Sequence, residues 1–276
     1  MPLDCRRYET NCGDCPQLRS CKDRDLSRLT WERKNREWRN LDITVVAPSR
    51  WMASCVGASS LLGDRRVEVI PNGLDITVFS PMDKQEARII LGLPTEGRFL
   101  LFSAMGGISS KEKGGDLLKA CLERLAVEPN GNFTLLLSGC EPSPEEGELP
   151  VPFINLGRLT EEGKMKQVYA AADLTVVSSR SESLGYVAME SLACGTPCVA
   201  FDHSGNKDVV DHMQNGYLAR AYHPAGLAAG IRWILEDPAR YKQLAEAGRK
   251  KIENVFSLRH VTRSYLDLYA EILSRV

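Results

Sequence analysis

Short apolar runs, many of them β-branched, alternate with longer segments of helical periodicity from about residue 42 onward. The short runs predict strands at 42–47, 98–104, 132–138, 152–156, 173–178 and 197–201. The longer segments predict helices near 50–62, 115–127, 161–171, 186–194, 224–236 and 257–274. Strands that alternate with such helices are typical of βαβ units, so the sequence predicts an α/β fold with a parallel sheet. The turn-rich stretch "VIPNGLDITVFSPMD" is interpreted as an interdomain connection.

Composition narrows the class of protein. The chain has 276 residues, of which 43% are hydrophobic and 26% charged, enough for a full core in one large or two modest domains. The balance of 35 Lys+Arg against 36 Asp+Glu argues against nucleic acid as a partner. No apolar run approaches the roughly 18–20 residues that span a bilayer, and the first five residues do not begin a signal peptide or anchor. We therefore expect a cytoplasmic protein.

Four of the nine cysteines lie together in "CRRYETNCGDCPQLRSC", namely Cys5, Cys12, Cys15 and Cys21. The Cys12-Gly-Asp-Cys15 spacing is that of a structural zinc ribbon, but the flanking gaps are irregular and no histidine lies nearby. Two interpretations stay open: a structural zinc site, or free and redox-labile thiols.

The segment "LSRLTWERKNREWRNL" predicts a helix that carries Trp31 and Trp38 on one face among several basic residues. Such a helix could rest on an anionic membrane surface. The interspersed Glu32 and Glu37 equally suit a solvated, salt-bridged helix that packs through its tryptophans.

The stretch "ESLGYVAMESLACGTPCVAF", residues 182–201, carries two glutamates around a helix entrance. Gly185 stands where free backbone N–H groups and the positive end of the helix dipole attract a phosphate. Glu190, about one turn inside the helix, could accept hydrogen bonds from ribose hydroxyls, while Glu182 faces whatever lies beyond the phosphates. The alternative is that Glu182 only compensates the helix dipole and Glu190 is a surface residue.

A second candidate anion site is "SAMGGISSKEKGGD", residues 103–116, which follows a predicted strand. Gly106 and Gly107 allow close backbone approach, and Lys113 could clamp a diphosphate through charge-assisted hydrogen bonds. Polar glycine-rich loops with lysines are also common without any ligand. Other chemistry is mostly excluded, because the four histidines lack metal spacing and no Gly-x-Ser-x-Gly elbow occurs. The sequence Asp23-Arg24-Asp25 follows no strand and is interpreted as solvated surface.

These motifs together resemble a known family. Glu182, seven further residues, Glu190 and then "SLACGTPCVAF" are similar to the donor-site motif of retaining glycosyltransferases of family four, which have the two-domain GT-B fold. The same resemblance covers "VVAPSRW", "VIPNGLDITVF", "KEKGGDLL", "INLGRLT", "VYAAADLTVVSS" and "NGYLA" in the family's order, from about residue 42 to the end. The segment "NCGDCPQL" resembles the cysteine-bearing loop of a subgroup that builds exopolysaccharide and colanic-acid-type glycans.

The resemblance implies a Rossmann-like domain, with helices on both faces of its sheet, that holds a nucleotide-diphosphate-sugar donor without a metal or other cofactor. Lys113 would contact the diphosphate and Glu182 the sugar hydroxyls, and both are implied to be catalytic. The other implied substrate-binding residues are Gly106, Gly107, Arg158 near the base, Ser183, Leu184, Gly185, Tyr186, and Glu190 at the ribose. Gly107 stands where many family members carry an arginine, which leaves the diphosphate with less positive charge.

The resemblance also implies a domain organisation. Residues 1–75 would be a remnant of the N-terminal, acceptor-side domain, 76–256 the donor-binding domain, and 257–276 a C-terminal crossover helix. On that helix, Val261, Tyr265, Leu268 and Ile272 are expected to form an exposed apolar stripe.

The function implied is sugar transfer, with retention of configuration, to a glycan or lipid-linked acceptor in polysaccharide biosynthesis. A separate acceptor-binding domain or chain would complete the site, and peripheral contact with the inner face of the membrane is a further expectation. The alternative is a non-catalytic nucleotide-sugar-binding module, or a truncated remnant without an acceptor domain.

Overall fold

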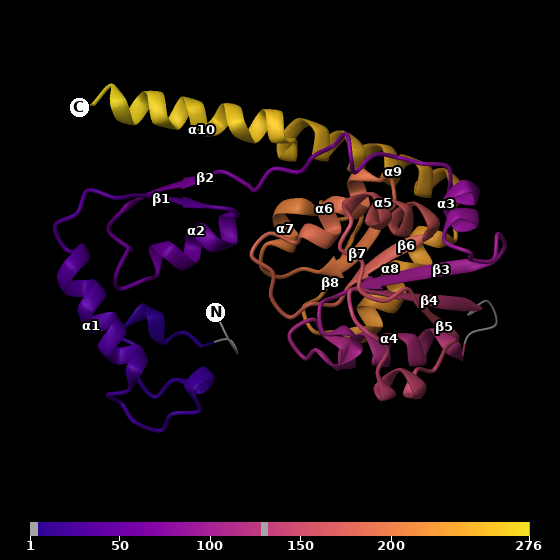
Figure 1. Ribbon diagram of the computed structural model, residues 1–276, viewed down its shortest axis with the longest axis horizontal. Helices are drawn as coiled ribbons and strands as arrows, with labels where there is room; N and C mark the ends of the chain where they lie inside the picture. Colours follow the sequence, from indigo (N-terminus) through magenta and orange to yellow (C-terminus); the bar gives the residue numbers. More distant parts are fainter. Residues whose placement is uncertain (1–4, 128–131, 276) are drawn as a thin grey trace. The chain divides into compact units, whose positions relative to one another are not determined.

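The chain folds into two compact units, Met1–Ile70 and Pro71–Val276, in the computed structural model of Figure 1. The structure describes residues 5–127 and 132–275. The prediction about a signal peptide falls partly on residues 1–4, which lie outside the described residues. The boundary after Ile70 lies near the predicted boundary at 75, and the three-part domain organisation stays a prediction.

The second unit is built on a six-stranded parallel sheet with the strand order β5-β4-β3-β6-β7-β8. The strands are β3 (Arg98–Ser103), β4 (Phe133–Ser138), β5 (Phe153–Asn155), β6 (Leu174–Val177), β7 (Cys198–Phe201) and β8 (Tyr217–Ala219). The strand order reverses between β3 and β6, a topological switch point at which open α/β sheets bind ligands. The predicted α/β fold with a parallel sheet is confirmed.

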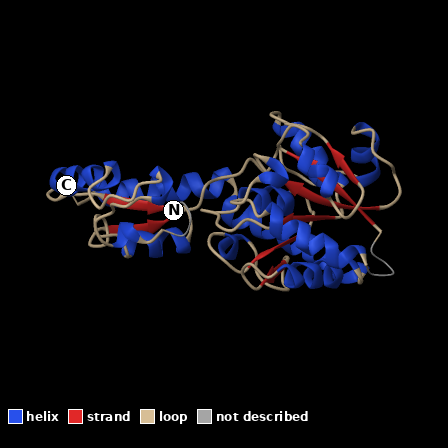
Figure 2. Cartoon of the chain, turned by 90° about the horizontal axis from the view of Figure 1, so that it is seen from below, coloured by secondary structure: helices blue, strands red, loops and turns tan. Residues whose placement is uncertain are grey.

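Helices cover both faces of this sheet (Figures 1 and 2). The helices of this unit are α3 (Lys84–Ile90), α4 (Gly115–Ala126), α5 (Glu162–Ala171), α6 (Tyr186–Ala193), α7 (Asn206–Val209), α8 (Pro224–Leu235), α9 (Pro238–Lys251) and α10 (Leu258–Leu273), of which α10 extends away from the sheet. In β3, Phe99 and Leu101 join a core with α5 and α6, whereas Leu100 and Phe102 join a second core with α4 and α8. Because both faces are buried, β3 reads as a continuous apolar run.

The sequence analysis did not predict several elements whose apolar periodicity is weak. All six predicted strands are present, but two further strands were missed. One is β8, which has three residues, and the other is β2 (Arg66–Val69) of the first unit, in which charged residues alternate with valines. Helix α9 is rich in charged residues; it begins at an Asp237 cap and continues into the π-helical turn Ile252–Phe256. The short 3-10 turns are Arg7–Glu9, Pro16–Leu18, Gly107–Ser109 and Pro144–Glu148.

The apolar stripe expected to be exposed on α10 is instead its buried side. Val261 and Leu268 are each only 6% exposed, and Tyr265 and Ile272 are partly buried. The prediction of an exposed stripe is wrong, because an amphipathic helix turns its regular apolar stripe inward. The exposed apolar side chains of α10 include Leu266, Tyr269 and Leu273.

The first unit contains α1 (Leu26–Trp38), β1 (Thr44–Ala47), α2 (Arg50–Gly57) and β2, and its two strands pair in parallel. In the part of this unit that the structure describes, Ala47 and Ile70 are the only fully buried apolar residues. A two-stranded sheet with so little core is marginal by itself.

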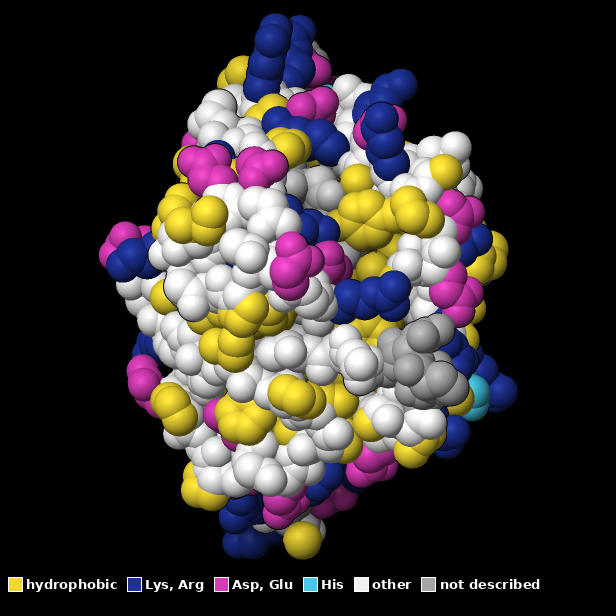
Figure 3. Space-filling view, turned by 90° about the vertical axis from the view of Figure 1, so that its right-hand side faces the viewer, with side chains coloured by type: hydrophobic (Ala, Val, Ile, Leu, Met, Phe, Trp, Pro, Cys, Tyr) yellow, Lys and Arg dark blue, Asp and Glu magenta, His cyan; other side chains and the backbone are white. Residues whose placement is uncertain are grey.

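The tryptophans of α1 are partly buried. The Trp31 indole N–H donates to Ser60 Oγ at 3.0 Å, and the Lys34 ammonium lies 5.0 Å from the Trp38 ring centre. This geometry is that of a helix packed through its tryptophans, and membrane contact stays a prediction. Over the described residues, no helix is both long and apolar enough to cross a bilayer. The face in Figure 3 carries charged side chains of both signs, interspersed with apolar ones.

A buried ion network fixes helix α3 against the sheet. Asp173, just before β6, accepts from Lys84 Nζ at 2.6 Å, from an Arg88 terminal nitrogen at 2.8 Å and from the Phe99 backbone N–H at 2.7 Å. Arg88 is only 3% exposed and also donates to the carbonyls of Ala171 and Thr95. The guanidinium thus ties together segments that are distant in the sequence.

We predict that Arg88→Ala lowers the free energy of unfolding by about 3–5 kcal/mol, because it removes the buried one of two cations at Asp173 and leaves the carbonyls of Ala171 and Thr95 without this donor. Urea denaturation measures this loss. The matched control is Arg98→Ala, at an exposed position, which should change stability by about 0.5 kcal/mol or less. Equal effects of the two substitutions would contradict the proposed role of the network.

Candidate functional site

The two predicted anion loops meet at the switch point between β3 and β6. Lys113, in the loop after β3, places its Nζ 2.7 Å from Glu182 Oε1, in the loop after β6. The Lys113 side chain is 33% exposed and that of Glu182 16%, so the ion pair is partly buried but still reachable from solvent. The structure therefore brings together the two residues for which a catalytic role was predicted.

Backbone contacts hold these two loops against each other. The Ser178 hydroxyl donates to the Lys113 carbonyl at 3.0 Å, and the Arg180 N–H donates to the Glu112 carbonyl at 2.9 Å. Gly114 has a φ of +71°, and a Cβ there would lie 1.9 Å from the Ser178 carbonyl oxygen. Only glycine permits this approach, which fixes where Lys113 leaves the backbone.

Arg180, which the sequence analysis did not single out, also connects the loop after β6 to the start of α4. Arg180 donates to both carboxylate oxygens of Asp116, at 2.8 and 2.7 Å. Hydrogen bonding to Arg180 is the main reason that the pKa of Asp116 lies below its usual value. Bidentate pairing of this kind orients the start of α4 relative to the loop after β6.

The entrance of α6 has the backbone geometry expected of a phosphate site. Gly185 is the N-cap residue, with a φ of +82°, and a Cβ there would lie only 2.7 Å from Asn206 Oδ1. The turn that precedes it is held by the segment after β7: the Glu182 N–H donates to Ser204 Oγ at 2.9 Å, and the Gly205 N–H donates to the Glu182 carbonyl at 2.8 Å. The N–H groups of the first turn of α6 have no partner within the helix and can receive an anion.

Three other predicted residues of this turn occupy different environments. Ser183 is exposed, Leu184 is fully buried in the core, and Tyr186 is 43% exposed. Only the backbone of Leu184 is left to face a ligand. Burial raises the pKa of the Tyr186 phenol, although a hydrogen bond with the Asn72 side chain opposes the shift.

Glu190 is a partly buried residue, so the alternative that it is merely a surface carboxylate is wrong. The Tyr169 hydroxyl donates to Glu190 Oε2 at 2.6 Å, and Tyr169 itself is fully buried. Burial raises the pKa of Glu190 above its ordinary value, and the hydrogen bond from Tyr169 partly offsets this rise. No sequence signal indicated this partner, because Tyr169 reads as an ordinary core residue of α5.

The remaining predicted residues lie at the carboxyl ends of β3 and β5. Gly106 and Gly107 have φ values of +83° and +58°, and a Cβ at Gly107 would lie 2.5 Å from Cys140 Sγ. An arginine at position 107 would need both a strained backbone and a displaced Cys140. Arg158 is exposed after β5, and its contact with a base stays a prediction.

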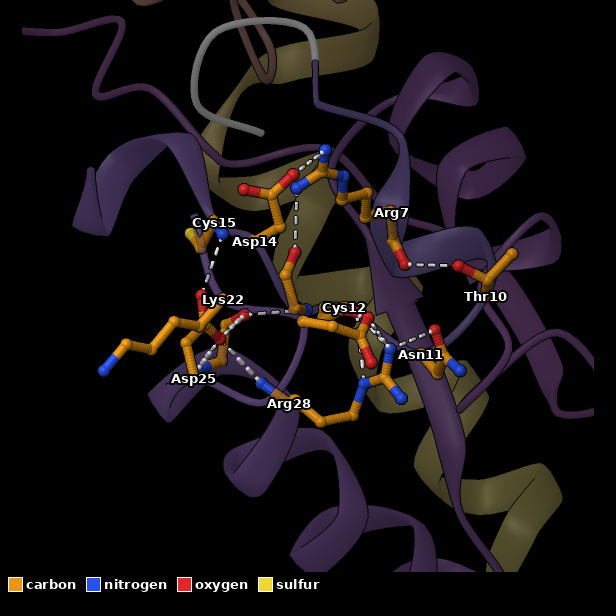
Figure 4. Close-up of polar contacts among 12 residues, drawn as sticks. Arg7, Thr10, Asn11, Cys12, Asp14, Cys15, Lys22, Asp25 and Arg28 are labelled. Atoms are coloured by element: carbon orange, nitrogen blue, oxygen red, sulfur yellow. Dashed lines mark hydrogen bonds and ion pairs between the residues drawn. The ribbon is translucent and has the colours of Figure 1, made fainter. Parts of the chain in front are cut away.

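Polar contacts connect the segments of the cysteine-rich loop (Figure 4). The Asp25 carboxylate caps α1 and accepts from the Cys15 backbone N–H at 2.8 Å, which corrects the interpretation of Asp25 as solvated surface. Arg28 donates to the Cys12 carbonyl at 2.9 Å. All nine cysteines are free thiols, and within the described ranges no three His, Cys, Asp or Glu side chains are placed to hold a metal ion. The zinc alternative at Cys5, Cys12, Cys15 and Cys21 gains no support from this arrangement.

The sheet, the switch point and the open helix N-terminus define an α/β domain of the class that binds nucleotides. Residues 83–251 match the family described as glycosyl transferases group 1, and the chain belongs to this family. It is similar to the D-inositol 3-phosphate glycosyltransferase of Thermobispora bispora, with 32% identity over 225 residues, 76% of this chain and 52% of that protein. The corresponding protein of a Nocardioides species is 33% identical over 74% of this chain and 48% of its own length. The chain thus spans about half the length of these curated relatives.

Solved structures show the same fold. A sucrose-phosphate synthase from Thermosynechococcus elongatus superposes with a TM-score of 0.75 at 25% identity, over 98% of this chain and 66% of that one. The Anabaena protein HepE, solved in complex with UDP and glucose, gives a TM-score of 0.68 at 22% identity over 96% of this chain and 70% of that one.

We predict that Glu190→Gln raises stability near neutral pH. Because burial raises the pKa of Glu190 above 4.5, the folded state retains this proton to a higher pH than the unfolded chain does. The ionised carboxylate therefore lowers stability increasingly as the pH rises above about 4.5, until the raised pKa is passed. The stability gain of the variant should be absent at pH 4 and largest near pH 8, by urea denaturation. The exposed Glu236 offers the control substitution Glu236→Gln. A flat pH profile for Glu190→Gln would contradict the prediction.

Proposed function

We propose that this chain is the donor-binding part of a glycosyltransferase that uses a nucleoside diphosphate sugar. The observation that carries the proposal is the meeting of Lys113 and Glu182 at the open N-terminus of α6, at the switch point of the sheet. A cation, a carboxylate and the backbone N–H groups of a helix N-terminus at one edge of the sheet suit a diphosphate joined to a polyhydroxylated ring.

In this proposal, Lys113 and the N-terminus of α6 stabilise the charge that develops on the leaving diphosphate. The bond between the anomeric carbon and the diphosphate oxygen breaks, and its electron pair stays on that oxygen. The acceptor hydroxyl oxygen bonds to the anomeric carbon and passes its proton to the departing diphosphate. Glu182, which pairs with Lys113 in the free protein, would turn to the sugar hydroxyls. The chemistry requires no metal, and retention of configuration is proposed from the family resemblance.

The nucleoside would lie toward Glu190, whose carboxylate accepts hydrogen bonds from the ribose hydroxyls. Tyr169 holds one of the two carboxylate oxygens, which orients the group for a diol. Arg158 is proposed to approach the base. Uracil is the first base to test, because HepE, which shares the fold, was solved with UDP bound.

The acceptor proposal changes in the light of the relatives. The resemblance of the sequence favoured a glycan or lipid-linked acceptor, but two similar curated proteins are named D-inositol 3-phosphate glycosyltransferases. We therefore propose a phosphorylated polyol as the first acceptor to test. A further domain or a separate chain would supply most of the acceptor contacts, because this chain spans about half of those relatives.

We predict micromolar binding of one of UDP, GDP and ADP in a calorimetric titration of the chain. Lys113→Ala should weaken this binding roughly 10- to 150-fold, the loss of a charge-assisted hydrogen bond of about 1.5–3 kcal/mol. The control is Lys119→Ala, a half-buried lysine of α4 that pairs with Glu148; the affinity of this variant should equal that of the wild type. A folded wild-type chain that binds none of the three nucleotides would refute the proposed donor site.

Transfer is tested separately, with UDP-glucose and D-inositol 3-phosphate, by the mass of one hexose added to the acceptor. We expect a product with the wild type and none with Glu182→Gln, if the chain alone is competent. Donor binding without transfer to this acceptor or to a glycan would instead favour the non-catalytic nucleotide-sugar-binding module.

A further inference from the structure

A fully buried amide without any hydrogen bond lies next to the proposed donor site. Asn206, the first residue of α7, is 0% exposed. Neither its Nδ2 nor its Oδ1 has a partner within the part of the chain that the structure describes. Buried side-chain amides in folded proteins are nearly always paired, so an orphan of this kind needs an explanation.

Another buried amide of the same domain shows the usual situation. Asn215 is 2% exposed, its Nδ2 donates to the Val209 carbonyl at 3.2 Å, and its Oδ1 accepts from the Asp211 N–H at 2.8 Å. The domain can therefore satisfy a buried asparagine, and the state of Asn206 is particular to its position.

That position is directly behind the turn that carries Glu182. A Cβ added to Gly185 would lie 2.7 Å from Asn206 Oδ1, so the amide faces the N-cap residue of α6. The neighbours of Asn206 already hold the same turn, through Ser204 Oγ and the Gly205 N–H. Ser204 and Gly205 are thus hydrogen-bonded to the turn, whereas the amide of Asn206 lies next to it without a hydrogen bond.

We propose that Asn206 is a positioning residue of the donor site, whose amide becomes hydrogen-bonded to the turn of residues 182–185 when a nucleoside diphosphate sugar occupies the N-terminus of α6. The inference rests on the proposed donor site. In the free protein Glu182 is held by Lys113; a bound diphosphate takes over Lys113 and releases Glu182. Gly185 and Gly205 on either side of this contact give the turn the backbone freedom to shift.

The energetic consequence is a bias toward the bound form. An unpaired buried amide destabilises the free conformation, and pairing on binding removes that penalty only when the donor is present. A ligand gains affinity from any group that is better satisfied in the bound state than in the free state. Asn206 would therefore strengthen donor binding at the expense of the stability of the free protein.

The test is Asn206→Leu, which keeps the side-chain shape and removes both polar atoms. We expect Tm of the free chain to rise, by about 2–4 °C, while the affinity for UDP-glucose falls about tenfold. The affinity for UMP, which lacks the second phosphate and the sugar, should change less. The matched control Asn215→Leu should lower Tm, because it leaves the Asp211 N–H and the Val209 carbonyl without their partner.

The outcomes separate this inference from the proposed function. A lower Tm for Asn206→Leu and also for the smaller Asn206→Ala would mean that the amide is already paired in the free protein, and would overturn the proposal. Unchanged affinity for UDP-glucose, with Lys113→Ala still weakened, would overturn it while leaving the donor site intact. A higher Tm together with weaker UDP-glucose binding supports it, since a merely structural residue would not move the two in opposite directions.

Discussion

Burial of the sheet on both faces is the constraint on which the rest of the structure depends. The strands that flank the switch point, β3 and β6, are almost entirely apolar, and the helices that cover them bury this surface in two cores. The charged groups gather instead at the ends of the strands, as Asp173 does before β6 and Lys113 after β3. The parallel arrangement places all the carboxyl ends at one edge, so loops far apart in the sequence meet there.

At that edge, charged side chains of the free protein form ion pairs with each other. Lys113 and Glu182 neutralise each other across the two loops, and glycines at close approaches, above all Gly114, allow the loops to touch. The ion pair holds the side chains of Lys113 and Glu182 partly desolvated at the edge of the sheet where the donor is proposed to bind. In the proposed donor site, the Lys113–Glu182 ion pair would be replaced by a contact of Lys113 with the diphosphate and a contact of Glu182 with the sugar. This exchange would not require the sheet to move.

Behind the edge lie polar groups that contribute little to stability by themselves. Tyr169 holds the carboxylate of Glu190 inside the domain, although burial disfavours its charge. Asn206 is buried without a partner beside Gly185. Both features make physical sense if the fold is optimised for the loaded site rather than for the empty one.

The sequence by itself determined the parallel α/β architecture, the strands at the centre of the sheet and the glycine-rich and glutamate-bearing loops at their ends, because these depend on local periodicity and turn chemistry. It did not determine α9 or β8, whose apolar patterns are too weak or too short. Only the tertiary structure decided that Lys113 pairs with Glu182, that Asp25 caps a helix, that the stripe of Val261 and Leu268 is buried, and that Tyr169 and Asn206 lie behind the site. These relations join residues that are distant in the chain or differ from ordinary core positions only by their neighbours, and no local pattern encodes such neighbours.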